Sequence, residues 1–123
     1  HKLNIIEKIG KLNQIISEHE EYICNPILNY IDSREDLNLI GKNKITNKDR
    51  APTVSFYSKS KSSKEISQKL QKNKIATRND NFYAWRCLKY LGIDTNDGVV
   101  RLSMTHYNNM EDTNRVLKAL SKI

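Results

Sequence analysis

Residues 98–123 have the sequence GVVRLSMTHYNNMEDTNRVLKALSKI, and this stretch decides the fold of the chain. Apolar and polar side chains alternate from Val99 to Thr105, which predicts a strand with one buried face and places Arg101 in the middle of the other face. Asn109 then has the position of a helix N-cap, with acidic residues in the turn that follows. The apolar stripe of this last helix consists of Val116, Leu117, Leu120 and Ile123. The stretch therefore predicts a strand followed by a helix that packs on a sheet.

Further signals precede this stretch. Thr53–Tyr57 alternates in the same way and predicts a second half-buried strand. Ser62 lies three residues before Glu65, which is the spacing of a capping box and predicts a helix as far as about Lys72. Two shorter strands are predicted at Leu37–Ile40 and Ile75–Arg78, with the polar cluster 79–81 ending the second and an irregular loop at 42–50.

The N-terminal third has apolar residues at helical spacing, from about residue 3 to residue 31. Gly10 and Pro26 interrupt this pattern, so either Asn25 caps a second helix with Pro26 in its first turn, or Pro26 kinks one long helix. The apolar positions are Ile5, Ile9, Leu12, Ile16, Ile23 and Ile27. A shorter helix is predicted from about Phe82 to Gly92, with Trp85, Leu88 and Leu91 facing inward.

These elements favour an α+β fold, a two-layer α/β sandwich. We expect a small, mostly antiparallel sheet of three or four strands with helices packed on one face, preceded by a long N-terminal helical segment. The chain has 123 residues, of which 37% are hydrophobic, so it can form one proper core. No apolar run approaches the roughly 20 residues of a membrane helix.

The net charge of +7 raises the question of a polyanionic partner. The densest basic run, Lys59–Lys74, contains no aromatic residue on which a base could stack, so a solvated helix face is the simpler interpretation. Cys24 and Cys87 form no CxxC pair, and the three histidines are scattered, so we expect no metal site. Buried or unreactive thiols in a reducing compartment are expected instead.

Arg101 is the sharpest candidate for a functional residue. Arg101 lies in the middle of a predicted strand, and its planar guanidinium can hold a carboxylate through two parallel hydrogen bonds. An ordinary surface arginine would show the same pattern. His106, Tyr107 and Asn108 follow where the strand ends, and they form either a simple turn or part of a site.

The same residues carry a family resemblance. Residues 98–123 resemble the C-terminal strand and helix of class V aminotransferase-fold enzymes, in which an Arg-x-Ser strand of cysteine desulfurases leads into a Tyr-Asn turn and a final amphipathic helix. Three upstream segments resemble the same family in the same order. They are RAPTVSF at 50–56, IATR at 75–78, and NFYA at 81–84, the last typical of a cysteine desulfurase-like subgroup.

The resemblance implies roles for individual residues. Arg101 corresponds to the arginine that binds the substrate α-carboxylate, and Arg78 lies beside the active-site loop and could assist. The candidates for that loop are Asn81, Phe82 and Tyr83, together with His106, Tyr107 and Asn108. Tyr83 stands where desulfurases have their nucleophilic cysteine. Cys87 lies four residues later within the predicted helix, where a packed thiol is poorly placed to act as a nucleophile.

The resemblance also implies pyridoxal phosphate as the cofactor of the parent enzyme, bound to a lysine of a large domain. Nothing in this sequence resembles that binding motif, so we expect no cofactor and no catalytic residue in this chain alone. Residues 1–33 would be the helical connection from the large domain, and residues 34–123 the C-terminal small domain. The parent would be a cytoplasmic, homodimeric lyase or transferase acting on an amino acid.

Two alternatives belong to other classes of function. One is a basic module that binds nucleic acid through its sheet, with Tyr57 on the polar face. The other is a protein-interaction domain whose polar sheet face is an interface. Of these, nucleic acid is the less expected partner, because no recognition motif for it is present.

Overall fold

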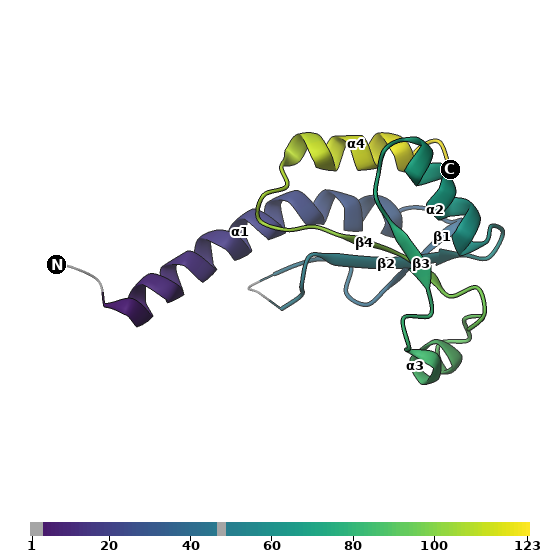
Figure 1. The fold of residues 1–123 in the computed structure, drawn as a ribbon, viewed down its shortest axis with the longest axis horizontal. Helices are drawn as coiled ribbons and strands as arrows, with labels where there is room; N and C mark the ends of the chain where they lie inside the picture. Colours follow the sequence, from purple (N-terminus) through teal and green to yellow (C-terminus); the bar gives the residue numbers. More distant parts are fainter. Residues whose placement is uncertain (1–3, 47–48) are drawn as a thin grey trace.

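The computed structural model describes residues 4–46 and 49–123. Its elements follow the order α1 (Ile5–Asp32), β1 (Leu37–Ile40), β2 (Thr53–Ser58), α2 (Ser63–Lys72), β3 (Arg78–Asp80), α3 (Trp85–Tyr90), β4 (Val99–Ser103) and α4 (Met110–Leu120). Figure 1 shows α1, α2 and α4 on one side of the sheet and the short α3 on the other. The α+β fold with a long N-terminal helix is confirmed.

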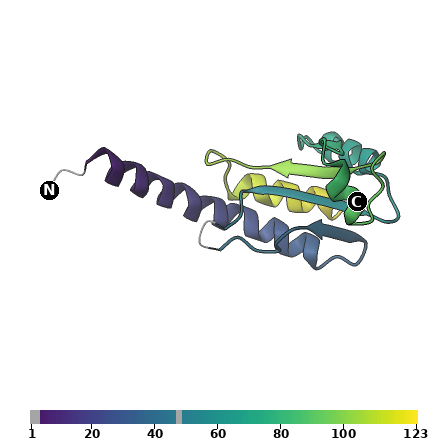
Figure 2. The same cartoon turned by 90° about the horizontal axis from the view of Figure 1, so that it is seen from below.

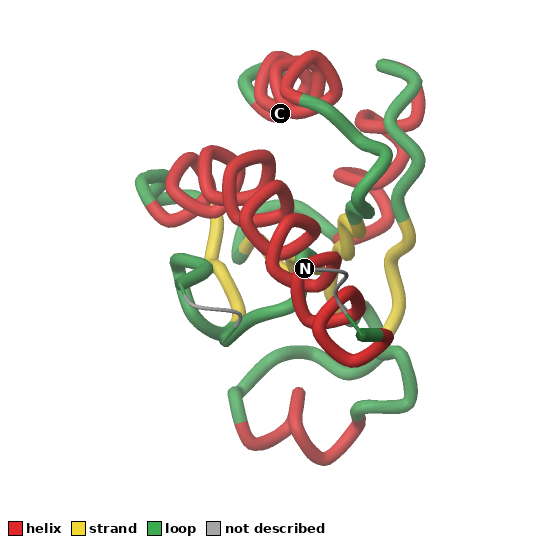
Figure 3. Tube along the Cα trace, turned by 90° about the vertical axis from the view of Figure 1, so that its left-hand side faces the viewer, coloured by secondary structure: helices red, strands yellow, loops and turns green. Residues whose placement is uncertain are grey.

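The sheet has four strands in the order β1-β2-β4-β3, and every neighbouring pair is antiparallel. The side chains that point toward the helical layer are fully or almost fully buried: Val54, Phe56, Val100 and Leu102. We call the opposite side the open face of the sheet. Figure 3 shows the strands between the three-helix layer and the separate α3 segment.

Helix α1 is one continuous helix that passes through both Gly10 and Pro26. Asn4 caps it in a capping box with Glu7. Asn25 therefore does not start a second helix. Its side chain instead accepts a hydrogen bond from the backbone N–H of Ile45 and donates one to the carbonyl of the same residue. Asn25 thus ties the helix to the loop before β2.

The two halves of α1 have different surroundings. The second half is part of the main core, where Ile23, Ile27 and Ile31 are fully buried. The first half extends away from the sheet, as Figure 2 shows. There the apolar residues are largely exposed, with Ile5 and Leu12 at 69% and 55%.

Strand β3 lies later than its sequence predicts. Ile75 belongs to the C-terminal cap of α2, because its N–H donates to Leu70 O and that of Lys74 donates to Gln71 O. With Lys74 at φ +61°, this is a Schellman motif with lysine in the left-handed position. The polar residues after Arg78 do not end the strand but form it. Asn79 also donates to the Ser63 hydroxyl and so ties β3 to α2.

Helix α3 also differs from the prediction. It begins at Trp85, because Phe82 has a left-handed backbone, and Trp85 and Leu91 are 53% and 46% exposed and do not face inward. Leu88 is the buried residue of the helix. It forms a second, smaller apolar cluster with Ile93 and Val99 on the open face. The alternation had placed Val99 on a polar face, and the α3 segment covers it there.

The predicted start of α4 is confirmed. Asn109 caps the helix in a capping box with Asp112, and Val116 and Leu120 face the core. Ser62 caps α2 by accepting from the N–H of Glu65. Strand β4 ends at Ser103, two residues before the predicted end, although Met104 is still buried.

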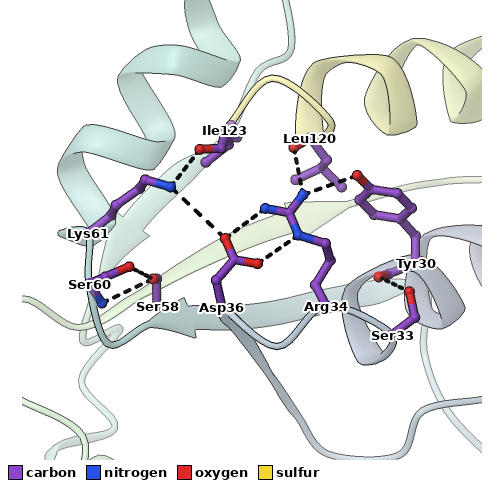
Figure 4. Close-up of polar contacts among 9 residues, drawn as sticks. All are labelled: Tyr30, Ser33, Arg34, Asp36, Ser58, Ser60, Lys61, Leu120 and Ile123. Carbon is purple, nitrogen blue, oxygen red and sulfur yellow. Dashed lines mark hydrogen bonds and ion pairs between the residues drawn. The ribbon is translucent and has the colours of Figure 1, made fainter.

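A polar network closes one end of the helical layer (Figure 4). The Arg34 guanidinium donates to both carboxylate oxygens of Asp36, at 2.6 and 2.7 Å, and also to Tyr30 Oη and the Leu120 carbonyl. Lys61 donates to the Ile123 carbonyl at 2.6 Å. These contacts join the end of α1, the start of β1, the loop before α2 and the end of α4. Among the described residues, no helix combines the length and the hydrophobicity that a membrane span requires.

Candidate functional site

Arg101 lies at the centre of the open face. In the register of the sheet it pairs with Ser55 of β2 on one side and with Arg78 of β3 on the other, and Ser55 in turn pairs with Ile40 of β1. Its neighbours in sequence, Val100 and Leu102, are buried on the opposite side. The rigid centre of the sheet therefore presents the Arg101 side chain to the open face, as the alternation predicted.

The ring of Phe82 lies against both arginines. The guanidinium carbon of Arg101 is 4.3 Å from the ring centroid, and that of Arg78 is 5.6 Å away. These are cation–π distances, and the closer contact is to Arg101. Throughout the described part of the chain, neither guanidinium has a carboxylate oxygen within 4.0 Å.

The loop that carries this ring has a strained backbone. Phe82 and Tyr83 have φ angles of +52° and +61°, a region that residues with a Cβ seldom adopt. Asn81 holds the loop, because its side chain accepts from the N–H of Tyr83 and donates to the Thr95 carbonyl. Phe82 turns back toward the sheet and packs against the small cluster of Leu88, Ile93 and Val99, while Tyr83 is fully exposed.

The structure does not bring the second group of loop candidates to this place. His106, Tyr107 and Asn108 follow the far end of β4, whereas the Phe82 loop lies beside its first residues. Asn108 has a structural role, since its side chain accepts from the N–H of Thr105 and donates to Asp112. His106 and Tyr107 are exposed and contact each other edge to face.

The two cysteines differ in environment. Cys24 is fully buried in α1, and this burial raises the pKa of its thiol to about 11. Cys87 is exposed on α3, so the expectation of a packed thiol is wrong for this residue. The six-residue α3 is too short to bury more than one of its faces, and Leu88 occupies that face.

The site suits a small anion. Two guanidinium groups on directly paired positions repel each other, and no acidic side chain of the described chain neutralises them. A bound carboxylate would do so and would receive parallel hydrogen bonds from Arg101. None of the four strands contains a lysine, so their open face offers no amine for a Schiff base. The arginine pair therefore has the chemistry to hold a carboxylate, and the strands supply no lysine for a covalent link to pyridoxal phosphate.

The basic run Lys59–Lys74 differs from this arginine pair, because two of its lysines already have partners. Lys69 pairs with Glu65 on the same helix, and Lys61 contacts the Ile123 carbonyl. Tyr57, which the nucleic-acid alternative needs as a stacking platform, is half-buried against the small apolar cluster. Among the described residues, no three metal-ligating side chains lie together.

Sequence reasoning did not find two features of the site. Ser55 lies beside Arg101, but its place depends on the pairing of β2 with β4, which alternation alone does not give. The stacking of Phe82 depends on two left-handed residues with no glycine or asparagine among them, so no residue type predicts it.

The fold and the site define an α+β domain whose antiparallel sheet presents two directly paired arginines, Arg78 and Arg101, on its open face. Comparison with known sequences gives the family: residues 2–116 match the family described as aminotransferase class V. The chain belongs to this family.

Relatives of known sequence or structure agree. The chain is 29% identical over 110 residues to the aminotransferase-like protein FGM3 of Gibberella zeae, which covers 88% of this chain and 27% of that protein. The apo structure of a cysteine desulfurase from Thermococcus onnurineus NA1 matches with a TM-score of 0.74 and 25% identity, over 87% of this chain and 25% of the other. The cysteine desulfurase CsdA of Escherichia coli matches in fold, with a TM-score of 0.71 and 16% identity, over 86% of this chain and 24% of the other. The chain thus spans about a quarter of the length of these relatives.

Proposed function

We propose that this chain is the C-terminal small domain of a pyridoxal-phosphate-dependent enzyme of the class V aminotransferase family, and that Arg101 binds the α-carboxylate of an amino-acid substrate. The observation that carries the proposal is the position of Arg101. It projects from the centre of a rigid sheet, beside a second arginine, with no acidic partner among the described residues.

The cofactor would bind outside this chain, in a large domain of the same polypeptide. Support for such a domain comes from two observations. The matched relatives are between three and four times as long as this chain, and the first half of α1 leaves an apolar stripe exposed at Ile5, Ile9 and Leu12. In this proposal residues 1–33 connect the two domains and residues 34–123 form the small domain.

Within the parent enzyme the residues of this chain position the substrate. Bound pyridoxal phosphate supplies an electron sink for a carbanion at the substrate Cα. Arg101 fixes the carboxylate on that carbon and so sets which of its bonds reacts, and Arg78 adds a second positive charge. The open face covers the active site and excludes water from it. Positioning of this kind contributes several kcal/mol to a rate enhancement in other enzymes.

The parent is a lyase or transferase of the cytoplasm that works as a homodimer. Tyr83, in place of a cysteine, argues against sulfur transfer through a persulfide on this loop, because a phenol does not accept sulfur as a thiolate does. Cys87 is exposed but lies in a helix four residues further on, so it does not replace that cysteine at the same position.

The proposal is tested with Arg101→Ala in the complete polypeptide that carries this sequence. We expect KM for the amino-acid substrate to rise roughly 10- to 100-fold, the effect of losing hydrogen bonds to a charged group. The absorbance of bound cofactor should not change. Arg115→Ala is the matched control, because Arg115 lies exposed on α4, away from the open face. Equal KM values in the Arg101 and Arg115 variants would exclude the role of Arg101.

A further inference from the structure

The strongest unexplained feature of the open face is the Phe82 ring. An apolar ring that lies on a guanidinium group could either cover that group or hold it in place. The two functions differ in whether Arg101 can still donate hydrogen bonds to a ligand while the ring is in place, since a guanidinium has five N–H donors.

We infer that Phe82 is a positioning residue, which holds the Arg101 guanidinium in a fixed orientation for a carboxylate ligand. This inference rests on the proposed function and deepens it. The guanidinium carbon of Arg101 lies over the ring, 4.3 Å from its centroid. Among the described residues no carboxylate oxygen lies within 4.0 Å of the Arg101 guanidinium, so no acidic partner occupies its N–H donors while the ring is in place.

The ring itself is fixed from two directions. Phe82 packs against the cluster of Leu88, Ile93 and Val99, which the α3 segment builds on the open face. The left-handed conformations of Phe82 and Tyr83 then return the chain toward the sheet, and Asn81 holds that turn. Backbone conformations of this kind persist where the surrounding contacts enforce them, and they concentrate at binding sites.

Such an arrangement has a direct effect on affinity. A free arginine side chain loses rotamer entropy when it binds a ligand. Because Phe82 and the sheet already restrict Arg101, less entropy remains to be lost, and binding becomes tighter without any new contact to the ligand. Arg78, whose guanidinium carbon is 5.6 Å from the same ring, is held less closely.

The test uses the 123-residue chain and acetate as the probe. The Nε–Hε signal of Arg101 is followed by NMR while sodium acetate replaces sodium chloride at constant ionic strength. In the wild type the ring current of Phe82 shifts this signal, and acetate shifts it further in a saturable way. Phe82→Leu, which removes the ring, should abolish the first shift and weaken acetate binding roughly two- to fivefold, as expected for the loss of a cation–π contact.

Three further variants make the outcome decisive. Phe82→Tyr keeps the ring and should restore both properties. Tyr90→Leu removes an exposed ring from the neighbouring helix and should change neither. Arg101→Ala should abolish saturable acetate binding. The backbone fingerprint of each variant verifies that it is folded.

The possible results separate the two proposals. If Phe82→Leu binds acetate as well as or better than the wild type while Arg101→Ala does not bind it, the positioning role is wrong and the carboxylate role of Arg101 stands. If acetate does not shift the Arg101 signal of the wild type, both the carboxylate role and the inference built on it are overturned.

Discussion

Gly98 lies so close to the main chain of Asp80 that no side chain fits between them. A Cβ at Gly98 would overlap the Asp80 carbonyl group and lie 2.6 Å from the nitrogen of Asn81. Gly98 also has a φ angle of +71°, which favours glycine. This contact sets the start of β4 against the end of β3, immediately before the loop that carries Phe82.

Gly98→Ala should therefore lower the free energy of unfolding by about 2–4 kcal/mol, because both the φ angle and the neighbouring backbone oppose a Cβ. Urea unfolding measures this loss. Gly10→Ala is the matched control: nothing lies within 4 Å of its Cβ position in α1. In a helix interior this second change should stabilise by about 0.5–1 kcal/mol. A Gly98 variant as stable as the wild type would disprove the close approach.

A hydrogen bond from the Thr113 side chain to the Ile23 carbonyl joins α4 to α1. Thr113 is fully buried, and its hydroxyl donates to the Ile23 carbonyl at 2.8 Å. Thr113→Val retains the shape but leaves that carbonyl without this donor, so we expect a loss of about 1–2 kcal/mol in thermal or urea unfolding. Thr95→Val, at a half-buried loop position, should cost less than about 0.5 kcal/mol. Equal effects of the two changes would contradict the role of this bond.

Acid should weaken the network around Arg34. Hydrogen bonds from Arg34 hold the pKa of the Asp36 carboxyl below its ordinary value. The unfolded chain therefore takes up this proton at a higher pH than the folded chain. The stabilisation is complete above the ordinary pKa of an aspartate and is lost as the pH falls through the lower, folded value.

Asp36→Asn tests this pH dependence. At neutral pH we expect a loss of about 1 kcal/mol, since the pair is partly exposed. The difference from the wild type should shrink when unfolding is measured between pH 5 and about pH 2. Glu35→Gln, an exposed neighbour, serves as the control and should show no comparable trend. A constant difference over this range would refute the linkage.

The two cysteines should react at very different rates. Burial of Cys24 and its raised pKa of about 11 make the thiolate scarce and inaccessible, whereas Cys87 is exposed. A colorimetric disulfide reagent at pH 8 should modify one thiol quickly in the native chain and two in denaturant. Cys87→Ser should remove the fast phase. Two fast thiols in the native protein would place Cys24 outside the core.

Local patterns predicted those parts of the fold that local forces determine. The Asn109 cap and the alternation around Arg101 need no distant partner, so the sequence signals are sufficient for α4 and β4. Ile75 was predicted as a strand residue, because a lysine rather than a glycine ends α2 and hides the cap. Alternation places Val99 on the polar face of β4. It is nevertheless buried, because Leu88 of α3 and Ile93 pack against it.

The candidate site divides in the same way. The sequence predicted strand positions for Arg101 and Arg78, and both residues lie in strands of the sheet. Their direct pairing depends on the register of β3, which the sequence places several residues too early. Because His106 and Tyr107 are close to Arg101 in the sequence, they were grouped with it. In the structure they follow the C-terminal end of β4, whereas the Phe82 loop lies beside its N-terminal end.

Helix α1 extends well beyond the core of this domain. Its 28 residues form a rod roughly 42 Å in length, clamped in the core around Ile23 and free toward Ile5. The helix is continuous from this exposed part into the core, so a tilt of the sheet would carry the exposed part along. A tilt of the sheet by about 10° would displace the Ile5 end of the helix sideways by roughly 5 Å, given a rise of about 1.5 Å per residue between Ile23 and Ile5. A small change in the angle of the open face, which carries Arg101, would therefore become a displacement of several ångströms at Ile5.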